Sequence, residues 1–413
     1  MNQPPVRVGV LATHPIQYYA PWYRALAARM DLDVFFSHRQ TASEQAAAGF
    51  GVSFDWDVPL LDGYRSRFLT NVARAPAVDR FRGCNTPEIG RIIEAGNFNA
   101  FIVHGWSTFS YWQAISACWR TRTPVLVRGD SALTTPRSRW RAAIKVPIYR
   151  WFIPRFDGYL VVGRRAREYV LHYGADPARC FDAPHCVDNR FFASRRDELH
   201  ANRTAIRARF GIPQHAVAFL FAGRFIQRKR PATFVRAVAA AAGQAPAVCG
   251  LMVGDGPIRG EAEALASETG APIRFSGFLN QTDMVAAYAA CDALIVPSEW
   301  ETWGLVVNEA MACGLPAIVT SGVACADDLV IPGVTGEVCA VDAVDQLAAQ
   351  IVRLAGDGAY RATLAVNARR RVDAWSVDAA VDGTVNALHR VARRSATDAR
   401  PTARDLTVHS EIP

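Results

Sequence analysis

Short, almost wholly apolar runs alternate with longer amphipathic stretches along most of this chain, and this alternation restricts its fold more than any other feature. The first series of runs lies at residues 6–12, 32–36, 100–104, 124–128 and 158–162. Strands that are apolar on both faces are buried on both faces, as in parallel sheets covered by helices. The pattern predicts an α/β domain over residues 1–190.

A second alternating series predicts a second α/β domain over residues 198–375. Its apolar runs lie at 217–222, 248–253, 273–275, 293–296 and 317–320. Between the two series, Pro184, Asp188 and the charged run at 195–198 predict a linker. The length of 413 residues suits two such domains. Because ligands bind outside the carboxyl ends of parallel strands, two facing sheets would place a site in the cleft between them.

The C-terminal part of the chain has a different character. Residues 376–395 are predicted to form a helix that packs back on the first domain. Residues 396–413 are polar, contain two prolines and lack periodicity, which predicts a disordered tail.

Composition narrows the class of protein. Lys plus Arg is 46 and Asp plus Glu is 38, so the net charge is +8, which favours anionic partners such as nucleotides, phospholipids or nucleic acid. The nine cysteines form no CxxC pair and no metal-binding spacing, as expected for reduced thiols in the cytoplasm. No signal peptide and no membrane span are predicted, because no apolar run is long enough.

Two carboxylates flank a predicted helix start in the segment 297–316. Glu301 precedes this start, which we place near Gly304, and Glu309 follows it. The first amides of a helix have no partner within it and bind anions, here those of Gly304, Leu305 and Val306. Carboxylates beside such a site can accept hydrogen bonds from vicinal hydroxyls.

A cluster of cations follows the apolar run 217–222. Gly223 allows a close turn, and Arg224 and Lys229 then fall at the mouth of the predicted cleft. An arginine fork and a lysine point charge at that edge suit a diphosphate. A basic surface loop is the alternative interpretation.

Together these segments resemble the family-4 (group 1) retaining glycosyltransferases of the GT-B fold. The resemblance rests on Gly223, Arg224 and Lys229, on the segments 253–257 and 275–278, and on Glu301 with Glu309. It implies two facing Rossmann-like domains with the active site in the cleft between them. It also implies transfer of a hexosyl or related sugar from a nucleotide diphosphate donor to a hydroxyl acceptor.

The resemblance also implies roles for single residues. Arg224 and Lys229 would hold the donor diphosphate, and Glu309 the ribose. Glu301, with the amides near Gly304, Leu305 and Val306, would hold the donor sugar. His104, at the end of an apolar run, would contact the transferred sugar.

The first loop departs from the family's glycine pair. It contains His14, Gln17 and Tyr18, which we expect to line an acceptor pocket together with Asp130. Asp55 and Asp57 form a DxD pattern, the metal–diphosphate motif of the other large transferase fold. With Arg224 and Lys229 present, we expect no metal and no cofactor other than the nucleotide-sugar co-substrate.

A basic stretch at 137–155 contains interleaved aromatic residues and no acid. Its cations are Arg137, Arg139, Arg141, Lys145, Arg150 and Arg155. A basic, aromatic helix can lie on an anionic membrane, so peripheral attachment to the inner face of the cell membrane is expected. A solvated helix face is the alternative. No nucleic-acid-binding module is recognisable.

Basic character and the resemblance point to a lipid-linked or cell-envelope saccharide as acceptor. Two other functions stay open. One is a nucleotide-sugar epimerase or hydrolase on the same fold. The other is a catalytically silent, membrane-associated protein that binds nucleotide sugars. This second alternative is less favoured, because the residues that the resemblance assigns to the donor site are all present: Arg224, Lys229, Glu301 and Glu309.

Overall fold

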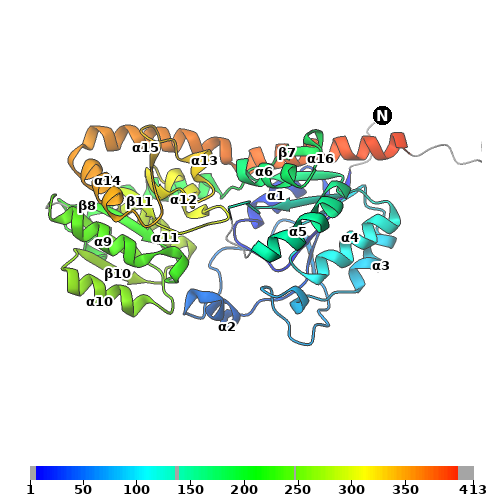
Figure 1. The fold of residues 1–413 in the computed structure, drawn as a ribbon, viewed down its shortest axis with the longest axis horizontal. Coiled ribbons are helices and arrows are strands. Elements are labelled where there is room, and N and C mark those ends of the chain that lie inside the picture. Colours follow the sequence, from blue (N-terminus) through cyan, green and yellow to red (C-terminus); the bar gives the residue numbers. More distant parts are fainter. Residues whose placement is uncertain (1–5, 135–138, 246–247, 399–413) are drawn as a thin grey trace, which may run out of the picture.

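Two parallel sheets, one in each half of the chain, form the frame of the molecule (Figure 1). The structure is a computed structural model that describes residues 6–134, 139–245 and 248–398. The predicted fold class, two Rossmann-like α/β domains, is confirmed.

The N-terminal sheet has seven strands in the order β3-β2-β1-β4-β5-β6-β7. The strands are β1 (Arg7–Ala12), β2 (Asp31–Phe36), β3 (Arg65–Phe68), β4 (Ala100–Val103), β5 (Val125–Gly129), β6 (Gly158–Val161) and β7 (Cys180–Asp182). The strand order reverses between β1 and β4, which opens a crevice at their carboxyl ends.

The C-terminal sheet has six strands in the order β10-β9-β8-β11-β12-β13. The strands are β8 (Val217–Ala222), β9 (Val248–Val253), β10 (Ile273–Gly277), β11 (Ala293–Val296), β12 (Ala317–Thr320) and β13 (Gly336–Cys339). Here the order reverses between β8 and β11, so the crevice lies beyond the ends of these two strands.

Helices cover both sheets. The N-terminal domain contains α1 (Ala20–Ala27), α2 (Ala42–Gln45), α3 (Glu88–Ala95), α4 (Phe109–Thr121), α5 (Arg139–Phe152) and α6 (Arg164–His172). The remaining helices are α7 (Asn189–His200), α8 (Arg203–Arg209), α9 (Pro231–Ala242), α10 (Arg259–Thr269), α11 (Gln281–Ala290), α12 (Leu305–Ala312), α13 (Ala326–Leu329), α14 (Val344–Gly356), α15 (Gly358–Val372) and α16 (Val377–Asp398).

The segment predicted as a linker is mostly helix. Asp188 caps α7 by accepting a hydrogen bond from the Phe191 amide at 3.0 Å. Phe192 is buried in the C-terminal core against Tyr288, with ring centroids 6.2 Å apart. The charged run 195–198 therefore lies on a helix that belongs to the C-terminal domain, and the first connection between the domains ends before Asp188.

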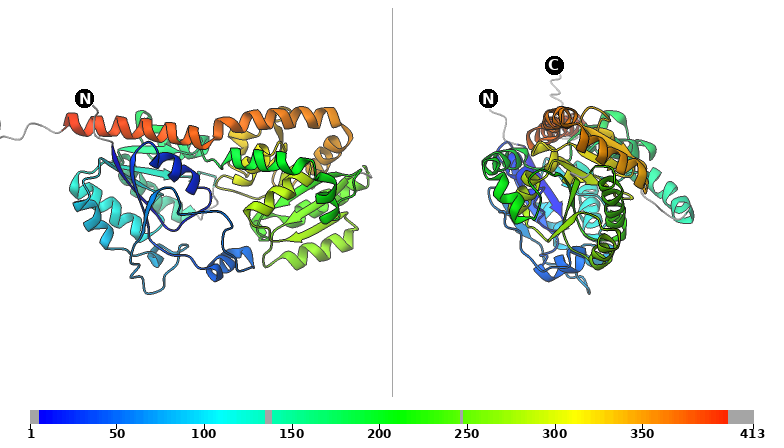
Figure 2. Two further views of the ribbon diagram at one scale, coloured as in Figure 1. Left: turned by 180° about the vertical axis from the view of Figure 1, so that it is seen from behind. Right: turned by 90° about the vertical axis from the view of Figure 1, so that its left-hand side faces the viewer.

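The last helix returns to the N-terminal domain. Figure 2 shows α16 lying along the N-terminal domain, beyond the orange α15. Its apolar side, including Val381, Leu388 and Val391, is buried in the same cluster as α1 and strands β1 and β6. The helix runs to Asp398, so 396–398 are helical, contrary to the predicted tail, and helix ends often differ by a residue or two from a sequence estimate. The rest of that tail lies outside the described residues.

Helix α5 carries only part of the predicted basic surface. Arg137 and the side chains of Arg139 and Arg141 lie outside the described residues. Lys145 Nζ donates to the Tyr169 hydroxyl at 2.5 Å and lies 4.5 Å from the centroid of the Tyr149 ring, so this cation is turned inward.

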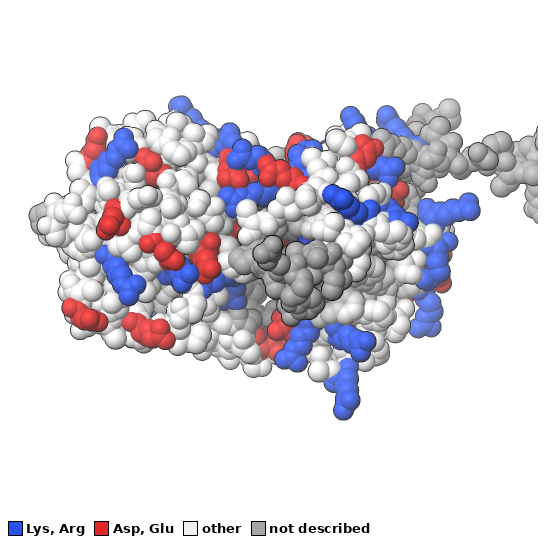
Figure 3. Space-filling view, in the orientation of Figure 1, with Lys and Arg blue, Asp and Glu red and all other residues white. Residues whose placement is uncertain are grey.

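On the face shown in Figure 3, Lys and Arg gather over the N-terminal domain, whereas Asp and Glu are more frequent over the C-terminal domain. None of the described helices combines the length and apolar character needed to cross a bilayer.

Candidate active site

A cavity of about 350 Å³ lies between the two domains. The C-terminal domain contributes Gly223, Arg224, Lys229, Glu301, Gly304, Leu305, Val306 and Glu309 to its lining, and the N-terminal domain contributes Gln17, Tyr18, Trp56, Asp130 and His185. The structure thus brings together residues that are far apart in sequence and that were predicted separately as donor and acceptor groups.

Lys229 and Glu301 form an ion pair at the edge of this cavity. The Lys229 Nζ to Glu301 Oε1 distance is 2.5 Å, and the Ser298 hydroxyl donates to the same oxygen at 2.9 Å. Burial by itself would raise the pKa of Glu301, but the Lys229 ammonium and the Ser298 hydroxyl outweigh it and lower the pKa. The carboxylate is therefore charged, buried and fixed in place.

Arg224 lies in the same cavity. Burial, and then repulsion from Arg228, lowers the pKa of its guanidinium, while Glu301 partly compensates. Two arginines and a lysine held close together with one carboxylate leave an excess of positive charge at the ends of β8 and β11. An anion is the ligand that such a cluster would stabilise.

Helix α12 points its N-terminus at this cluster. Gly304, at the N-cap, has φ = 102°, a conformation that favours glycine. The first internal bond runs from the Val307 amide to the Gly304 carbonyl at 2.9 Å, so the preceding amides of Leu305 and Val306 have no partner within the helix. The predicted helix start is where the structure has it.

Glu309, one and a half turns into α12, is buried and faces two tyrosines. The Tyr288 hydroxyl donates to Glu309 Oε2 at 2.5 Å. Burial raises the pKa of Glu309 to about 7, although hydrogen bonds from Tyr288 and Tyr18 work in the opposite direction. This carboxyl can accept further hydrogen bonds from a ligand, and its charge depends on pH near neutrality.

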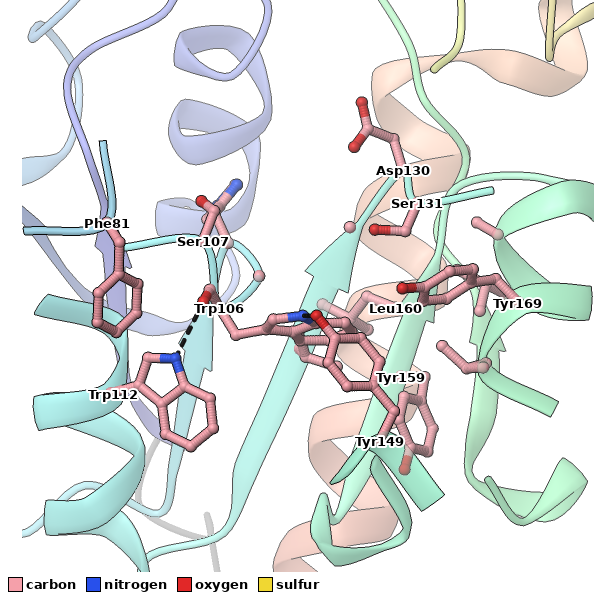
Figure 4. Close-up of a pocket in the computed structure, with 17 residues that line it drawn as sticks. Phe81, Trp106, Ser107, Trp112, Asp130, Ser131, Tyr149, Tyr159, Leu160 and Tyr169 are labelled. Carbon is pink, nitrogen blue, oxygen red and sulfur yellow. Dashed lines mark hydrogen bonds between the residues drawn. The ribbon is translucent and has the colours of Figure 1, made fainter. Parts of the chain in front are cut away.

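A second cavity, of about 480 Å³, lies within the N-terminal domain beyond the ends of β4, β5 and β6. Figure 4 shows Asp130 and Ser131 at one end of it and the rings of Trp106, Tyr149 and Tyr159 at the other. Trp106 Nε1 donates to the Tyr149 hydroxyl at 2.9 Å, which fixes both rings. Asp130 lines this cavity and also the interdomain cavity, so the two meet there.

The two remaining predicted residues lie away from the interdomain cavity. His104 lines the second cavity, and its Nε2 lies 3.2 Å from the Tyr23 hydroxyl. Burial, with repulsion from Arg128, lowers the pKa of His104 to about 3, so its ring is neutral. His14 Nδ1 lies 3.0 Å from the Thr13 hydroxyl, and His14 is not among the lining residues of either cavity.

His185, Asn308 and Trp303 have no role predicted from the sequence, although Asn308 and Trp303 lie within the segment 297–316. Trp303 Nε1 donates to Asn308 Oδ1 at 2.8 Å, and Asn308 Nδ2 donates to the His185 carbonyl at 3.2 Å. This buried chain of bonds links the N-terminus of α12 to the N-terminal domain. One signal for His185 is that it comes shortly after β7, at the same edge of the sheet where His104 directly follows β4. Strand β7 is too short to be predicted from its apolar residues.

Asp55 and Asp57, the residues of the DxD pattern, both form hydrogen bonds with the C-terminal domain. Asp57 accepts a hydrogen bond from the Thr282 amide at 3.1 Å, and the Asp55 carbonyl accepts one from Asn280 at 2.7 Å. Both residues thus join the N-terminal domain to the start of α11. Within the described residues, no group of three or more His, Cys, Asp or Glu is arranged to hold a metal ion.

Two facing Rossmann-like domains with a charged cleft define the GT-B class of glycosyltransferase fold. The structure resembles Anabaena Alr3699/HepE in complex with UDP and glucose, with a TM-score of 0.68 and 18% identity over 93% of this chain and 99% of that one. It also resembles WaaG, a glycosyltransferase involved in lipopolysaccharide biosynthesis, with a TM-score of 0.65 and 16% identity over 92% and 99% of the two chains. At these identities the likeness establishes the fold.

Residues 202–371 match the family described as glycosyl transferases group 1. This match covers the C-terminal domain, which contains the motifs that carry the predicted resemblance. It is 34% identical to D-inositol 3-phosphate glycosyltransferase of Geodermatophilus obscurus over 56% of this chain and 52% of that protein. It is also 34% identical to the enzyme of the same name from Thermomonospora curvata, over 52% and 53% respectively. The chain thus spans about half the length of the curated relatives it matches.

Proposed function

We propose that this protein is a retaining glycosyltransferase that moves a sugar from a nucleotide diphosphate donor to an acceptor hydroxyl. The observation that carries this proposal is the convergence of Arg224, Lys229, Glu301 and the α12 N-terminus in one cavity, which Asp130 lines from the other domain. The group 1 domain supports it. Further support comes from the Anabaena protein of the same fold, which was solved in complex with UDP and glucose.

In this proposal the diphosphate lies against Arg224, Lys229 and the first amides of α12. These groups stabilise the negative charge that develops as the bond from the anomeric carbon to the diphosphate oxygen breaks. The acceptor oxygen forms its bond to the same face of that carbon, and its proton passes to the departing phosphate oxygen. No metal ion and no further cofactor is required.

We place the acceptor in the cavity of the N-terminal domain. Its hydroxyl would approach the donor beside Asp130, where the two cavities meet. Flat aromatic rings such as those of Trp106 and Tyr149 suit the apolar faces of a saccharide. A lipid-linked or cell-envelope saccharide is the acceptor class that we propose.

We further propose that the enzyme acts in the cytoplasm and contacts the anionic inner face of the membrane through α5 and the turn after it. Arg150, Trp151 and Arg155 are exposed there, and Ile148 is 49% exposed. Basic residues near an anionic surface contribute about 1 kcal/mol each. Replacing Arg150 and Arg155 by Glu should therefore abolish flotation with anionic vesicles, and equal binding of the wild type to neutral and anionic vesicles would contradict this part.

The test of the function is a screen of nucleotide sugars by thermal shift, followed by product analysis with the donor that stabilises most. The expected product is a new glycoside with the anomeric configuration of the donor. Release of free sugar, or an isomerised donor, in the absence of any acceptor product would favour the hydrolase or epimerase alternative. A chain that binds the donor and makes no product of any kind would favour the silent alternative.

A further inference from the structure

A segment of the N-terminal domain crosses to the other domain beside the proposed donor site. We call residues 49–57 the crossing segment. Figure 1 shows α2, which precedes it, lying between the two domains, and the left view of Figure 2 agrees. A Cβ on Gly49 would lie 3.5 Å from Arg224 Cδ, and one on Gly51 would lie 3.3 Å from Asp255 Oδ1. The segment therefore passes the carboxyl ends of β8 and β9 in turn.

The C-terminal end of the crossing segment contacts the loop between β10 and α11 and the start of α11. The rings of Phe54 and Phe278 have centroids 4.3 Å apart. Asp57 accepts hydrogen bonds from the amide and the hydroxyl of Thr282, in the first turn of α11. A carboxylate at a helix N-terminus is favourable, so these hydrogen bonds stabilise the attachment.

Trp56 lies between these two attachments and lines the interdomain cavity. Its ring is half-buried and packs edge-on against Phe54, with centroids 4.9 Å apart. The neighbouring lining residues from the β10–α11 region are Phe278, Leu279, Gln281 and Met284. This end of the cavity is lined by apolar and uncharged groups, in contrast to the cations at the ends of β8 and β11.

The polarity of the cavity fixes which part of a donor fits each end. The diphosphate belongs with Arg224 and Lys229, and the transferred sugar must face Asp130, where the acceptor cavity opens. The remaining part of a nucleotide sugar is its base, which is flat and uncharged. Among the lining residues that the structure describes, those around Trp56, Phe278 and Leu279 offer an uncharged surface beyond the diphosphate.

We propose, resting on the function proposed above, that Trp56 binds the nucleobase of the donor by stacking on its face. Asp57 is a positioning residue that holds Trp56 there through Thr282. The N-terminal domain thus completes the donor site as well as supplying the acceptor site, and donor binding joins the two domains.

The experiment compares two ligands by calorimetry on the full chain. One is the nucleoside diphosphate among UDP, GDP and ADP that binds the wild type most tightly, and the other is inorganic pyrophosphate, which lacks a base. Loss of one aromatic stacking partner weakens binding by about 5- to 150-fold. Trp56→Ala should weaken nucleotide binding by this factor and leave pyrophosphate binding unchanged, while Trp56→Phe should retain most of the affinity.

Variants on the same segment separate stacking from folding. Val52→Ala, whose side chain is exposed and outside the cavity lining, should bind both ligands as the wild type does. Asp57→Ala should weaken nucleotide binding selectively, and Asp57→Asn, which keeps an acceptor oxygen for Thr282, should restore much of it.

Two results would overturn the inference alone: unchanged nucleotide affinity in Trp56→Ala, or an equal loss for nucleotide and pyrophosphate. A wild type that binds none of the three nucleotides would overturn the proposed function and this inference with it.

Discussion

At the scale of single residues, Glu309 links stability to pH. Its pKa of about 7 in the folded protein exceeds its ordinary value of 4.5, because the carboxyl is buried. The folded state therefore keeps a proton that the unfolded state releases, and the free energy of unfolding should fall as pH rises from about 4.5 to about 7. Glu309→Gln cannot ionise, so its melting temperature relative to wild type should rise between pH 5 and pH 8. A difference in melting temperature between Glu309→Gln and the wild type that stays the same at all pH values would contradict this.

The same carboxyl should make nucleotide binding depend on pH in the opposite sense. A carboxylate accepts hydrogen bonds from ribose hydroxyls better than a neutral carboxyl does, so nucleotide affinity should increase as pH rises through about 7. Glu309→Ala should lose about 1.5–3 kcal/mol of binding free energy above that pH. Calorimetry at pH 6 and pH 8 provides the measurement, and an unchanged affinity in the variant would remove Glu309 from the site.

Residue-level prediction from the sequence succeeds where a motif carries its own geometry. Lys229 belongs to a short run of cations that follows a glycine, and Glu301 and Gly304 lie at a predicted helix start. Each of them can therefore be found from its near neighbours in the sequence. Trp56 and His185 enter the same cavity from segments with no such local constraint. Trp56 packs on Phe54, which contacts Phe278, and the His185 carbonyl accepts a hydrogen bond from Asn308. No window of sequence contains these long-range contacts.

At the scale of elements, α16 acts as part of the N-terminal core although it ends the described chain. Leu388 is fully buried against residues of α1 and the N-terminal sheet. Leu388→Ala should lower the free energy of unfolding by about 2–5 kcal/mol, measured by chemical denaturation. The neighbouring His389 is exposed, so His389→Ala is the matched control and should change stability by less than about 0.5 kcal/mol. If Leu388→Ala and His389→Ala had the same free energy of unfolding, α16 would not be part of this core.

The elements that sequence patterns miss are those with little apolar signal. Strand β3 lies at a sheet edge and reads Arg-Ser-Arg-Phe, with the first three residues exposed and only Phe68 partly buried, so it lacks the buried run that marks the central strands. The charges of helix α7 are typical of a linker, yet one face of this helix is anchored by Phe192. The central strands of both sheets are predictable because burial on both faces requires an unbroken apolar run.

At the scale of the whole molecule, the two domains meet through a tight contact at Gly163. A Cβ there would lie 2.3 Å from Trp303 Cζ3 and 2.7 Å from Asp328 Oδ2. Gly163→Ala should displace Trp303, disturb its bond to Asn308 and weaken the interface by about 1–3 kcal/mol. We expect a larger radius of gyration in X-ray scattering and a lower melting temperature. Gly260→Ala, where a Cβ meets nothing within 4 Å, is the control, and identical behaviour of both variants would contradict the expected role of this contact.

We propose that the cleft itself, through Arg224, Lys229 and the α12 N-terminus, holds the donor diphosphate during sugar transfer. The most direct measurement is the initial rate of transfer in excess EDTA, for the wild type and for Arg224→Ala and Lys229→Ala. We predict that the wild type keeps its rate in EDTA and that each variant is slower by about 10²–10³-fold. Activity that EDTA abolishes and magnesium or manganese restores, with variants as fast as the wild type, would contradict it.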